Sequence, residues 1–459
     1  MRVETITWAD DAGRLVAAVA AQPGGWVLES SRRGHGLGRF SFLGWKPQAT
    51  LRAAEGGVIL SDAAGTHALA RSPLQALEEV ADVCALPADA PAPPVPFAGG
   101  WVGFLGYELI AHWERLDLRH AEPRRLPEME FRLFDGVLAL DHENGALHAV
   151  AQPWRRPEDE VMAELLALVK DARAASAPAL PAAPRVLSRE SNFSRESFVA
   201  AAGRVRDYIR DGEVYQVNLA QRFSLELEAA DPVALYLRLR ALNPSPYAAF
   251  LPVEGGHLLS MSPEQLLCRR GERLASRPIK GTRPRGRDAA EDAALREALV
   301  ASAKDRAELL MIVDLVRNDL GRIAWPGSVT VPQLFSLETY PTVFHQTAVV
   351  EARRDPACGL AACLEAVFPG GSITGAPKLR AMEIIHELEG VPREAYTGAI
   401  GYVGAGGDFE FNIAIRTASL RENTLLYHAG GGIVWDSDPA AEFEETLDKA
   451  AGLFRALRF

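Results

Sequence analysis

Two short segments carry side chains suited to acid–base or covalent chemistry. Glu264 directly follows Pro263, and Lys280 lies between Ile279 and Gly281. A carboxylic acid held by a rigid backbone can act as a general acid. A lysine beside apolar groups can lose solvent, which lowers its pKa and leaves a neutral, nucleophilic amine. The alternative for both residues is an ordinary position in a loop.

A predicted helix over 303–317 carries a stripe of mixed character. Asp305, Glu308, Ile312 and Leu315 follow one another at helical spacing and therefore share one face. A carboxylate on a partly apolar stripe points inward unless it lies at the edge of that stripe. The alternative is a salt bridge to a nearby arginine.

The segment 439–454 is predicted to be a second helix of this kind. At about 100° per residue, Glu442, Glu445 and Lys449 cluster on one face. The apolar residues cluster on another face: Phe443, Leu447, Ala450 and Phe454. The carboxylates of the two helices could together form one oxygen-only site, which suits Mg²⁺ and a small substrate that bears a carboxylate. The alternative is a solvated face with a Glu445–Lys449 pair.

Three further segments could bind an anion. Glycine-rich turns occur at 369–378, before a predicted helix, and at 428–434, and exposed backbone amides at such places bind anions. Tight turns without a ligand are the alternative. In the predicted strand 409–417, Arg416 projects from the face opposite to the phenylalanines and isoleucines, where it could clamp a carboxylate bidentately. An ordinary surface arginine is the alternative.

Composition limits the class of protein. The chain has 459 residues, 48% of them apolar, and a formal net charge of −11. General nucleic-acid binding relies on basic patches, so an acidic chain argues against it. No apolar run is long enough to span a membrane, and the N-terminus lacks the apolar core of a signal peptide, so a cytoplasmic location is expected. The four cysteines show no metal-binding spacing, and we expect them to be reduced thiols.

The chain divides at proline- and alanine-rich stretches. These lie at 86–96 and 175–185 and are predicted to be loops or linkers. Helices are predicted over 158–175 and from an N-cap at Ser194. Strands are predicted over 99–108 and 131–140. The whole is a mixed α and β pattern, which predicts sheets flanked by helices.

Together these segments resemble the chorismate-utilising enzymes, a family that includes anthranilate synthase component I, aminodeoxychorismate synthase component I, and isochorismate and salicylate synthases. The matching motifs follow one another in fixed order at 212–219, 262–264, 278–282, 304–322, 368–378, 415–417, 430–434 and 442–449. The resemblance covers nearly all of residues 190–459, which it identifies as a chorismate-binding catalytic region. Residues 1–185 match more loosely, as an N-terminal anthranilate synthase component I-like region.

The resemblance implies an α+β fold in which two antiparallel sheets stack and helices pack outside them. It also implies Mg²⁺ bridging Glu308 and Glu445 to the ring carboxylate of chorismate, with Glu442 close by. The substrate-binding residues that it implies are Arg416, Tyr396, Thr374, Gly430, Gly431, Gly432, Lys449 and His345.

Two positions indicate a branch of the family. Isochorismate and salicylate synthases have a lysine that activates water where this chain has Gln216, and anthranilate synthases usually have alanine where it has Lys280. The form Pro-Ile-Lys-Gly-Thr resembles aminodeoxychorismate synthases. In that branch the lysine attacks C2 of chorismate, Glu264 protonates the departing C4 hydroxyl, and ammonia then attacks C4. The alternative is anthranilate synthase component I. Because no glutaminase segment follows Lys449, ammonia is expected from a separate glutamine amidotransferase subunit.

Some relatives hold tryptophan between the N-terminal region and the core. The matching positions here are Ser30, Leu37, Gly38, Arg39, Phe40, Pro246, Tyr247 and Ala248. Leu37 and Gly38 depart from the relatives' pattern, as does the stretch 31–36. These residues form a second candidate site, for tryptophan.

Overall fold

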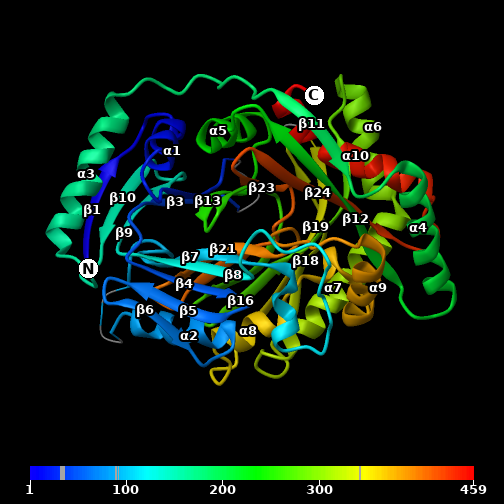
Figure 1. The fold of residues 1–459 in the computed structure, drawn as a ribbon, viewed down its shortest axis with the longest axis horizontal. Coiled ribbons are helices and arrows are strands. Elements are labelled where there is room, and N and C mark those ends of the chain that lie inside the picture. Colours follow the sequence, from blue (N-terminus) through cyan, green and yellow to red (C-terminus); the bar gives the residue numbers. More distant parts are fainter. Residues whose placement is uncertain (32–36, 88–89, 91, 341–342) are drawn as a thin grey trace.

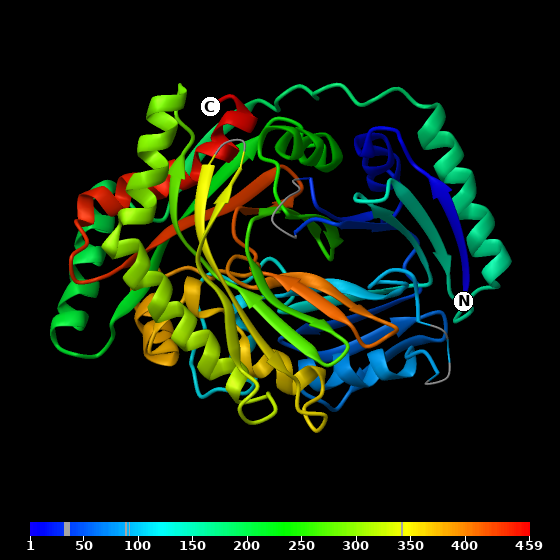
Figure 2. The same ribbon diagram turned by 180° about the vertical axis from the view of Figure 1, so that it is seen from behind.

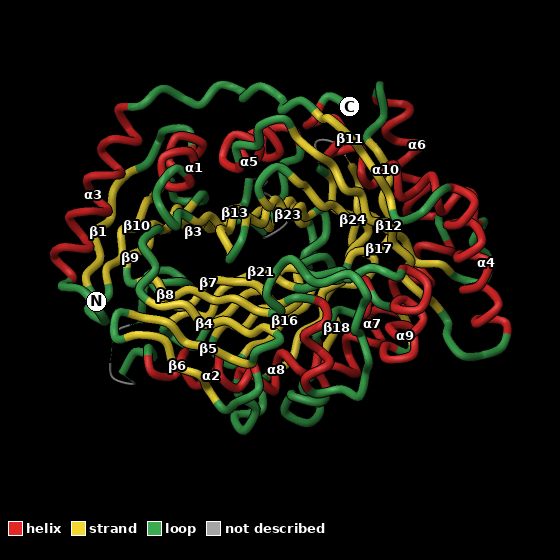
Figure 3. Tube along the Cα trace, viewed as in Figure 1, coloured by secondary structure: helices red, strands yellow, loops and turns green. Residues whose placement is uncertain are grey.

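Two large antiparallel sheets form the centre of the molecule. A computed structural model describes residues 1–31, 37–87, 90, 92–340 and 343–459. Within these residues each sheet has twelve strands, and Figure 3 shows the two layers of strands one above the other, with helices on the outside. The predicted α+β arrangement of stacked antiparallel sheets with flanking helices is therefore confirmed.

The first sheet carries β20 (Gly375–Ala376) beside β12, and its other strands follow one another across the sheet as β1 (Arg2–Thr7), β10 (Ala146–Ala151), β9 (Gly136–Asp141), β3 (Phe40–Gly44), β2 (Trp26–Glu29), β13 (Tyr247–Val253), β14 (Gly256–Ser262), β23 (Thr417–Arg421), β24 (Thr424–Ile433), β12 (Gln216–Leu227) and β11 (Val186–Ser191).

The second sheet carries β18 (Thr330–Thr339) beside β19, and its other strands follow one another as β17 (Ile279–Pro284), β19 (Val343–Arg353), β16 (Arg273–Arg277), β15 (Gln265–Arg270), β22 (Phe409–Asn412), β21 (Ala399–Gly404), β7 (Gly100–Leu105), β8 (Met129–Phe134), β4 (Ala49–Ala54), β5 (Gly57–Asp62) and β6 (Gly65–Leu69).

Both sequence regions contribute strands to both sheets. In the first sheet β2 pairs with β13, with Val27 opposite Phe250. In the second sheet β7 pairs with β21, with Phe104 opposite Ile400. The two regions therefore share continuous hydrogen-bonded sheets. The residues 175–185 that connect them run over the top of the molecule from α3 to β11 in Figure 1.

Helices cover the outer faces of the sheets. They are α1 (Ala12–Ala20), α2 (Pro73–Val83), α3 (Glu158–Ala174), α4 (Arg195–Arg210), α5 (Pro232–Leu242), α6 (Ala289–Ala301), α7 (Ala303–Gly321), α8 (Leu360–Val367), α9 (Lys378–Glu389) and α10 (Pro439–Leu457), with short 3₁₀ turns η1 (Tyr107–His112) and η2 (Gly371–Ile373). The predicted N-cap of α4 is confirmed, because the Ser194 side chain accepts a hydrogen bond from the Ser197 N–H. No helix within the described ranges is long and apolar enough to cross a membrane.

Three apolar layers hold the sheets and helices together. Trp26, Phe42, Phe97, Phe104 and Phe134 fill the space between the two sheets. A second cluster lies between the first sheet and α1, α3, α5 and α10, and a third lies between the second sheet and α2, α7 and α8. In Figure 2 the long yellow strands β18 and β19 run beside α7, at the edge of the second sheet. The cysteines are free, and all four are at least partly buried.

Two predicted strands are wrong in their extent, because the chain passes from one sheet to the other within each. The segment 131–140 forms β8 in the second sheet and β9 in the first, and the segment 409–417 ends as a strand at Asn412. An apolar alternation continues through such a crossing, since both sheets bury their inner faces, so the sequence pattern does not reveal the break. Arg416, at the end of the second crossing, has a left-handed φ of 50°.

Candidate active site

Glu264 and Lys280 come together where the chain crosses between the sheets. Glu264 stands between β14 and β15, and its Oε1 accepts a hydrogen bond of 3.3 Å from the N–H of Ile279, the residue before Lys280. The carbonyl of Glu264 accepts a bond of 2.9 Å from the N–H of Ile413, in the second crossing. Burial raises the pKa of the Glu264 carboxyl, and the Lys280 ammonium opposes this shift only in part.

The Lys280 amine is anchored to a neighbouring turn. Its Nζ donates a hydrogen bond of 3.1 Å to the carbonyl of Ser372 in η2. Burial lowers the pKa of Lys280, and the carboxylate of Glu308 works against that shift. The two pKa changes thus favour a protonated Glu264 and a neutral Lys280 amine, the forms that a general acid and a nucleophile need.

Gly281 allows α7 to approach Lys280 closely. Its φ is 79°, and a Cβ atom there would lie 2.9 Å from Leu299 and 3.0 Å from Asp305. The inward stripe predicted on α7 therefore faces β17. Asp305 forms an ion pair of 2.8 Å with Arg283, while the Lys280 ammonium acts on the pKa of Glu308 through its charge and lowers it.

Carboxylates of α7 and α10 lie near enough to influence one another's pKa. Burial raises the pKa of Glu308, and Glu445 raises it further. Burial also raises the pKa of Glu442, which accepts a hydrogen bond of 2.6 Å from the Ser437 hydroxyl. The sequence places Glu442 on the acidic face of the helix, yet it is only 5% exposed, because α10 lies against β24 along this side.

Gly431, which has no side chain, lies beside three charged residues of α10. A Cβ atom on Gly431 would lie 3.2 Å from Glu442 Oε2, 3.4 Å from Glu445 Oε1 and 3.5 Å from Lys449 Nζ. Lys449 Nζ also donates a hydrogen bond of 2.8 Å to the Gly430 carbonyl and pairs with Glu445 at 2.7 Å. The predicted set of Gly430, Gly431, Glu442, Glu445 and Lys449 is thus one cluster, and its lysine and Glu445 are open to solvent.

The carboxylate oxygens of Glu308, Glu442 and Glu445 are the kind of ligand that a hard cation such as Mg²⁺ prefers. In this structure two of these carboxylates are paired with lysines instead. Within the described ranges, no group of three or more His, Cys, Asp or Glu side chains is gathered closely enough to hold a metal ion. Glu445 pairs with Lys449, and Glu308 lies 3.9 Å from Lys304. The half-buried Glu308 and the buried Glu442, whose pKa values are both raised, nonetheless offer oxygen ligands that a divalent cation would stabilise in the charged form.

Arg416 and Tyr396 lie on adjacent backbone segments. The Thr397 N–H, next to Tyr396, donates a bond of 2.9 Å to the carbonyl of Ala414. The Arg416 guanidinium has no hydrogen-bond or ion-pair partner among the residues that the structure describes, so this cation can receive an anion. The Tyr396 ring stacks on His428 with centroids 4.9 Å apart and planes at 7°. His428 leads into the glycines 430–432 on β24.

Thr374 and His345 each lie next to a segment that carries or anchors Lys280. Thr374 is fully buried, and its hydroxyl donates a bond of 3.0 Å to the Gly370 carbonyl. It lies two residues beyond the Ser372 carbonyl that holds Lys280. His345, on β19, shares a bond of 2.8 Å with the hydroxyl of Thr282, two residues after Lys280.

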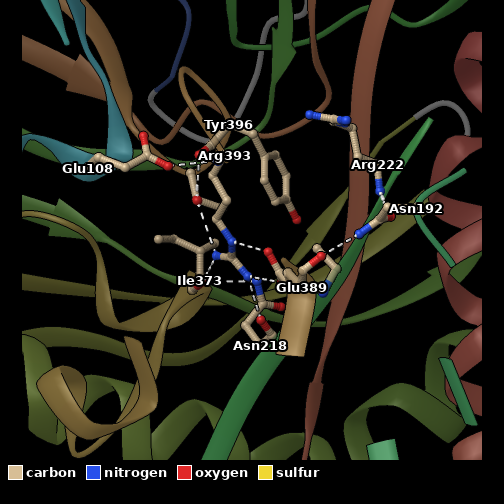
Figure 4. Close-up of polar contacts among 10 residues, drawn as sticks. Glu108, Asn192, Asn218, Arg222, Ile373, Glu389, Arg393 and Tyr396 are labelled. Carbon is tan, nitrogen blue, oxygen red and sulfur yellow. Dashed lines mark hydrogen bonds and ion pairs between the residues drawn. The ribbon is translucent and has the colours of Figure 1, made fainter. Parts of the chain in front are cut away.

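A buried arginine that the sequence analysis missed lies behind these residues. Arg393 is 1% exposed, forms an ion pair of 2.6 Å with Glu389, and contacts Asn218, Ile373 and Tyr396 (Figure 4). No periodicity marks it, because it lies in the irregular segment between α9 and β21. A charged residue in such a segment predicts a surface position, so only the fold reveals its burial.

The residues of the predicted tryptophan site line a separate cavity. Its volume is about 300 Å³, and its walls include Leu37, Gly38, Arg39, Phe40, Pro246, Tyr247 and Ala248. Ser30 is buried nearby and does not line it. Residues 32–36 of the divergent stretch lie outside the described residues. The tryptophan assignment stays a prediction.

Known proteins share this sequence and this fold. The chain is 38% identical over 454 residues to aminodeoxychorismate synthase component 1 of Klebsiella aerogenes, covering 99% of this chain and 98% of the relative. It is 40% identical over 466 residues to anthranilate synthase component 1 of Streptomyces coelicolor, covering 98% of this chain and 87% of the relative.

The solved structure of anthranilate synthase component I from Streptococcus pneumoniae superposes with a TM-score of 0.80 at 31% identity, covering 91% of this chain and 94% of that one. The fold is therefore that of anthranilate synthase component I. The sequence pattern of the family described as chorismate binding enzyme matches residues 26–455. The chain thus belongs to the chorismate-binding enzyme family.

Proposed function

We propose that the chain acts as an aminodeoxychorismate synthase component 1, which converts chorismate and ammonia to 4-amino-4-deoxychorismate on the way to 4-aminobenzoate and folate. The observation that carries the proposal is the pairing of a half-buried Lys280 amine with a buried Glu264 carboxyl, joined through the Ile279 backbone. The similarity to aminodeoxychorismate synthase component 1 over nearly the whole chain supports it.

In the proposed reaction Lys280 and Glu264 act together. The neutral Lys280 amine forms a bond to C2 of chorismate, the ring double bonds shift, and the C4 hydroxyl leaves as water with a proton from Glu264. Ammonia then forms a bond to C4, and the lysine leaves C2 as the amine. The Glu264 carboxylate takes the surplus proton from the new C4 ammonium. Because the enzyme's own amine occupies C2, nitrogen remains only at C4.

The remaining residues of the site would hold the substrate. We assign the ring carboxylate of chorismate to a Mg²⁺ site of Glu308 and Glu445 with Glu442 close by, where the ion would neutralise the charge that these carboxylates share with the substrate. Arg416, Tyr396 and the amides of Gly430–Gly432 would bind the enolpyruvyl carboxylate, and the unpartnered Arg416 guanidinium supports this assignment. Thr374, Lys449 and His345 would complete the walls.

Ammonia is proposed to come from a separate glutamine amidotransferase subunit. The names of the relatives, which are called component 1, support a second subunit. The acidic chain offers no support for a nucleic-acid partner.

Product identification tests this function against its nearest rival. The chain is incubated with chorismate, ammonium and Mg²⁺, and an aminodeoxychorismate lyase is then added. We expect 4-aminobenzoate, detected by mass and fluorescence, only after the lyase is added. Anthranilate formed without the lyase would instead establish anthranilate synthase component I, an activity that the 40% identity to such an enzyme makes the rival.

A further inference from the structure

Arg393 uses every N–H group of its guanidinium inside the protein. An arginine side chain offers five N–H donors in a fixed fork. Here Nε bonds to Glu389 Oε2 at 2.9 Å, Nη1 to the Ile373 carbonyl at 3.1 Å and the Thr397 hydroxyl at 3.2 Å, and Nη2 to Glu389 Oε1 at 2.6 Å and the Asn218 carbonyl at 2.7 Å. Figure 4 shows these bonds converging on one guanidinium.

Two of these acceptors, Ile373 and Asn218, belong to or bind the turn that anchors Lys280. The Ile373 carbonyl that receives Arg393 follows the Ser372 carbonyl that receives Lys280 Nζ. Asn218 reinforces the same turn, because its amide donates a bond of 2.9 Å to the Ile373 carbonyl and its backbone N–H donates one of 2.8 Å to Thr374. The guanidinium thus fixes the peptides to which Lys280 is anchored.

The faces of the guanidinium support a second part of the site. It lies 5.4 Å from the centre of the Tyr396 ring and 4.9 Å from that of Tyr107. Tyr396 in turn stacks on His428, which leads into Gly430–Gly432. A shift of the guanidinium would therefore move the Tyr396 ring as well as the Lys280 anchor.

A residue of the N-terminal region, Glu108, binds the backbone at Arg393. Glu108 accepts bonds from the backbone N–H of Arg393 at 2.7 Å and of Glu394 at 3.1 Å. Glu389, the ion-pair partner, also accepts a bond of 2.8 Å from the Ala220 N–H on β12. Elements from both regions of the chain therefore determine where the guanidinium lies.

We propose that Arg393 is a positioning residue for amination: it aligns the Lys280 amine, through the 372–374 turn, with the substrate held at Tyr396. The inference rests on the proposed function and adds a residue that does not itself touch the substrate. A lysine at this position would keep the charge beside Glu389. It would lose the planar fork, because three donors on one atom cannot reach carbonyls on different sides.

The test compares Arg393→Lys with Arg238→Lys. Arg238 is also buried, at 3% exposure, and donates to the carbonyls of Ala456 and Pro181, neither of them a candidate site residue. In Arg393→Lys we expect kcat to fall by about tenfold to 100-fold with the KM for chorismate nearly unchanged, since small misplacements cost this much. In Arg238→Lys we expect a comparable loss of Tm with kcat per folded molecule preserved.

A folded Arg393→Lys with a kcat near that of the wild type would overturn the proposal, and so would an equal loss of kcat in Arg238→Lys. If Arg393→Lys does not fold, Thr397→Val removes one acceptor of the guanidinium at nearly the same volume, and an unchanged kcat there would overturn it too. The product that the wild type makes from chorismate distinguishes a failure of the proposed function from a failure of the proposed role of Arg393. If it makes a chorismate product other than the C4 amine, the proposed function fails, and the kcat comparison on that product still tests Arg393.

Discussion

Lys280 Nζ donates a hydrogen bond of 3.1 Å to the carbonyl of Ser372, which holds the amine beside α7 and the Glu264 carboxyl. A flexible lysine side chain costs entropy to fix, so a defined acceptor is what keeps its amine in one place. The acceptor belongs to a turn that is itself bonded to Asn218 and Arg393. The reactive amine is thus positioned by backbone that side chains of other elements hold rigid.

Replacing Lys280 by alanine should abolish C4 amination. The substitution removes the only amine proposed to attack C2, so we expect kcat to fall by at least about 1,000-fold, the scale seen when a covalent nucleophile is lost. The measurement is 4-aminobenzoate formed in the lyase-coupled assay. The matched control is Lys170→Ala, at an exposed position on α3. Undiminished 4-aminobenzoate from Lys280→Ala would rule out the covalent step.

Glu264→Gln should slow the reaction while leaving the local structure intact. The amide oxygen can still accept the Ile279 N–H, but the side chain has no proton to give to the leaving hydroxyl. General acids contribute about 10²- to 10⁴-fold, and we expect a fall in kcat of that size with little change in Tm. Glu272→Gln, which alters a surface ion pair with Arg353, serves as the control. A kcat within twofold of the wild type would assign Glu264 a structural role.

The helices that carry site residues could be predicted from the sequence. The segments where the chain passes from one sheet to the other, which also carry site residues, could not. The helices bearing Glu308 and Glu445 could be read from apolar spacing, because each buries one stripe. The turns at Glu264 and Arg416 could not, because the apolar pattern continues when a strand changes sheet. Arg393 was missed for a related reason. Its burial is visible only once the Asn218 carbonyl, 175 residues away in the chain, and the Ile373 carbonyl are in place beside it.

Because its pKa is lowered, Lys280 should react with amine-acylating reagents at a lower pH than an ordinary lysine does. Only the neutral amine is acylated, so labelling rises with pH through the pKa. Burial lowers that pKa, and the midpoint for Lys280 should therefore lie below the ordinary value for a lysine side chain, about 10.4, when its peptide is followed by mass spectrometry. Since Glu308 raises the pKa of Lys280, Glu308→Gln should move the midpoint lower still. A midpoint for Lys280 at or above the ordinary lysine value would contradict this account.

The 300 Å³ cavity should bind tryptophan if its assignment is right. The Tyr247 hydroxyl is buried there without a hydrogen-bond partner among the described residues, so it can receive a polar group of the ligand. A ligand that binds only the folded chain raises its free energy of unfolding, by about 2.7 kcal/mol when the ligand is at 100 times its Kd. The Tm therefore rises with ligand concentration. We expect L-tryptophan to do so in the wild type and less in Tyr247→Phe. An unchanged Tm at millimolar tryptophan would contradict the tryptophan assignment.

Binding of Mg²⁺ should weaken as the pH falls. The loss should begin at a higher pH than it would for a site made of carboxylates with ordinary pKa values. The metal needs deprotonated ligands, and burial raises the pKa values of Glu308 and Glu442, so these groups take up protons early on acidification. Burial has the same tendency at Glu445, but the Lys449 ammonium outweighs it and leaves that pKa lowered. Glu445 should thus stay charged, and its exchange for glutamine should cost at least about tenfold in Mg²⁺ affinity.

Calorimetric titration of Mg²⁺ at several pH values measures both effects, and Glu444→Gln, one residue away and paired with Arg195 on the surface, is the matched control. If Glu445→Gln bound Mg²⁺ as tightly as Glu444→Gln does, the metal would have to lie elsewhere. An affinity that did not change with pH would exclude Glu308 and Glu442 as its ligands. Because the two variants differ by one position on α10, any difference between them reports which face of that helix the metal contacts.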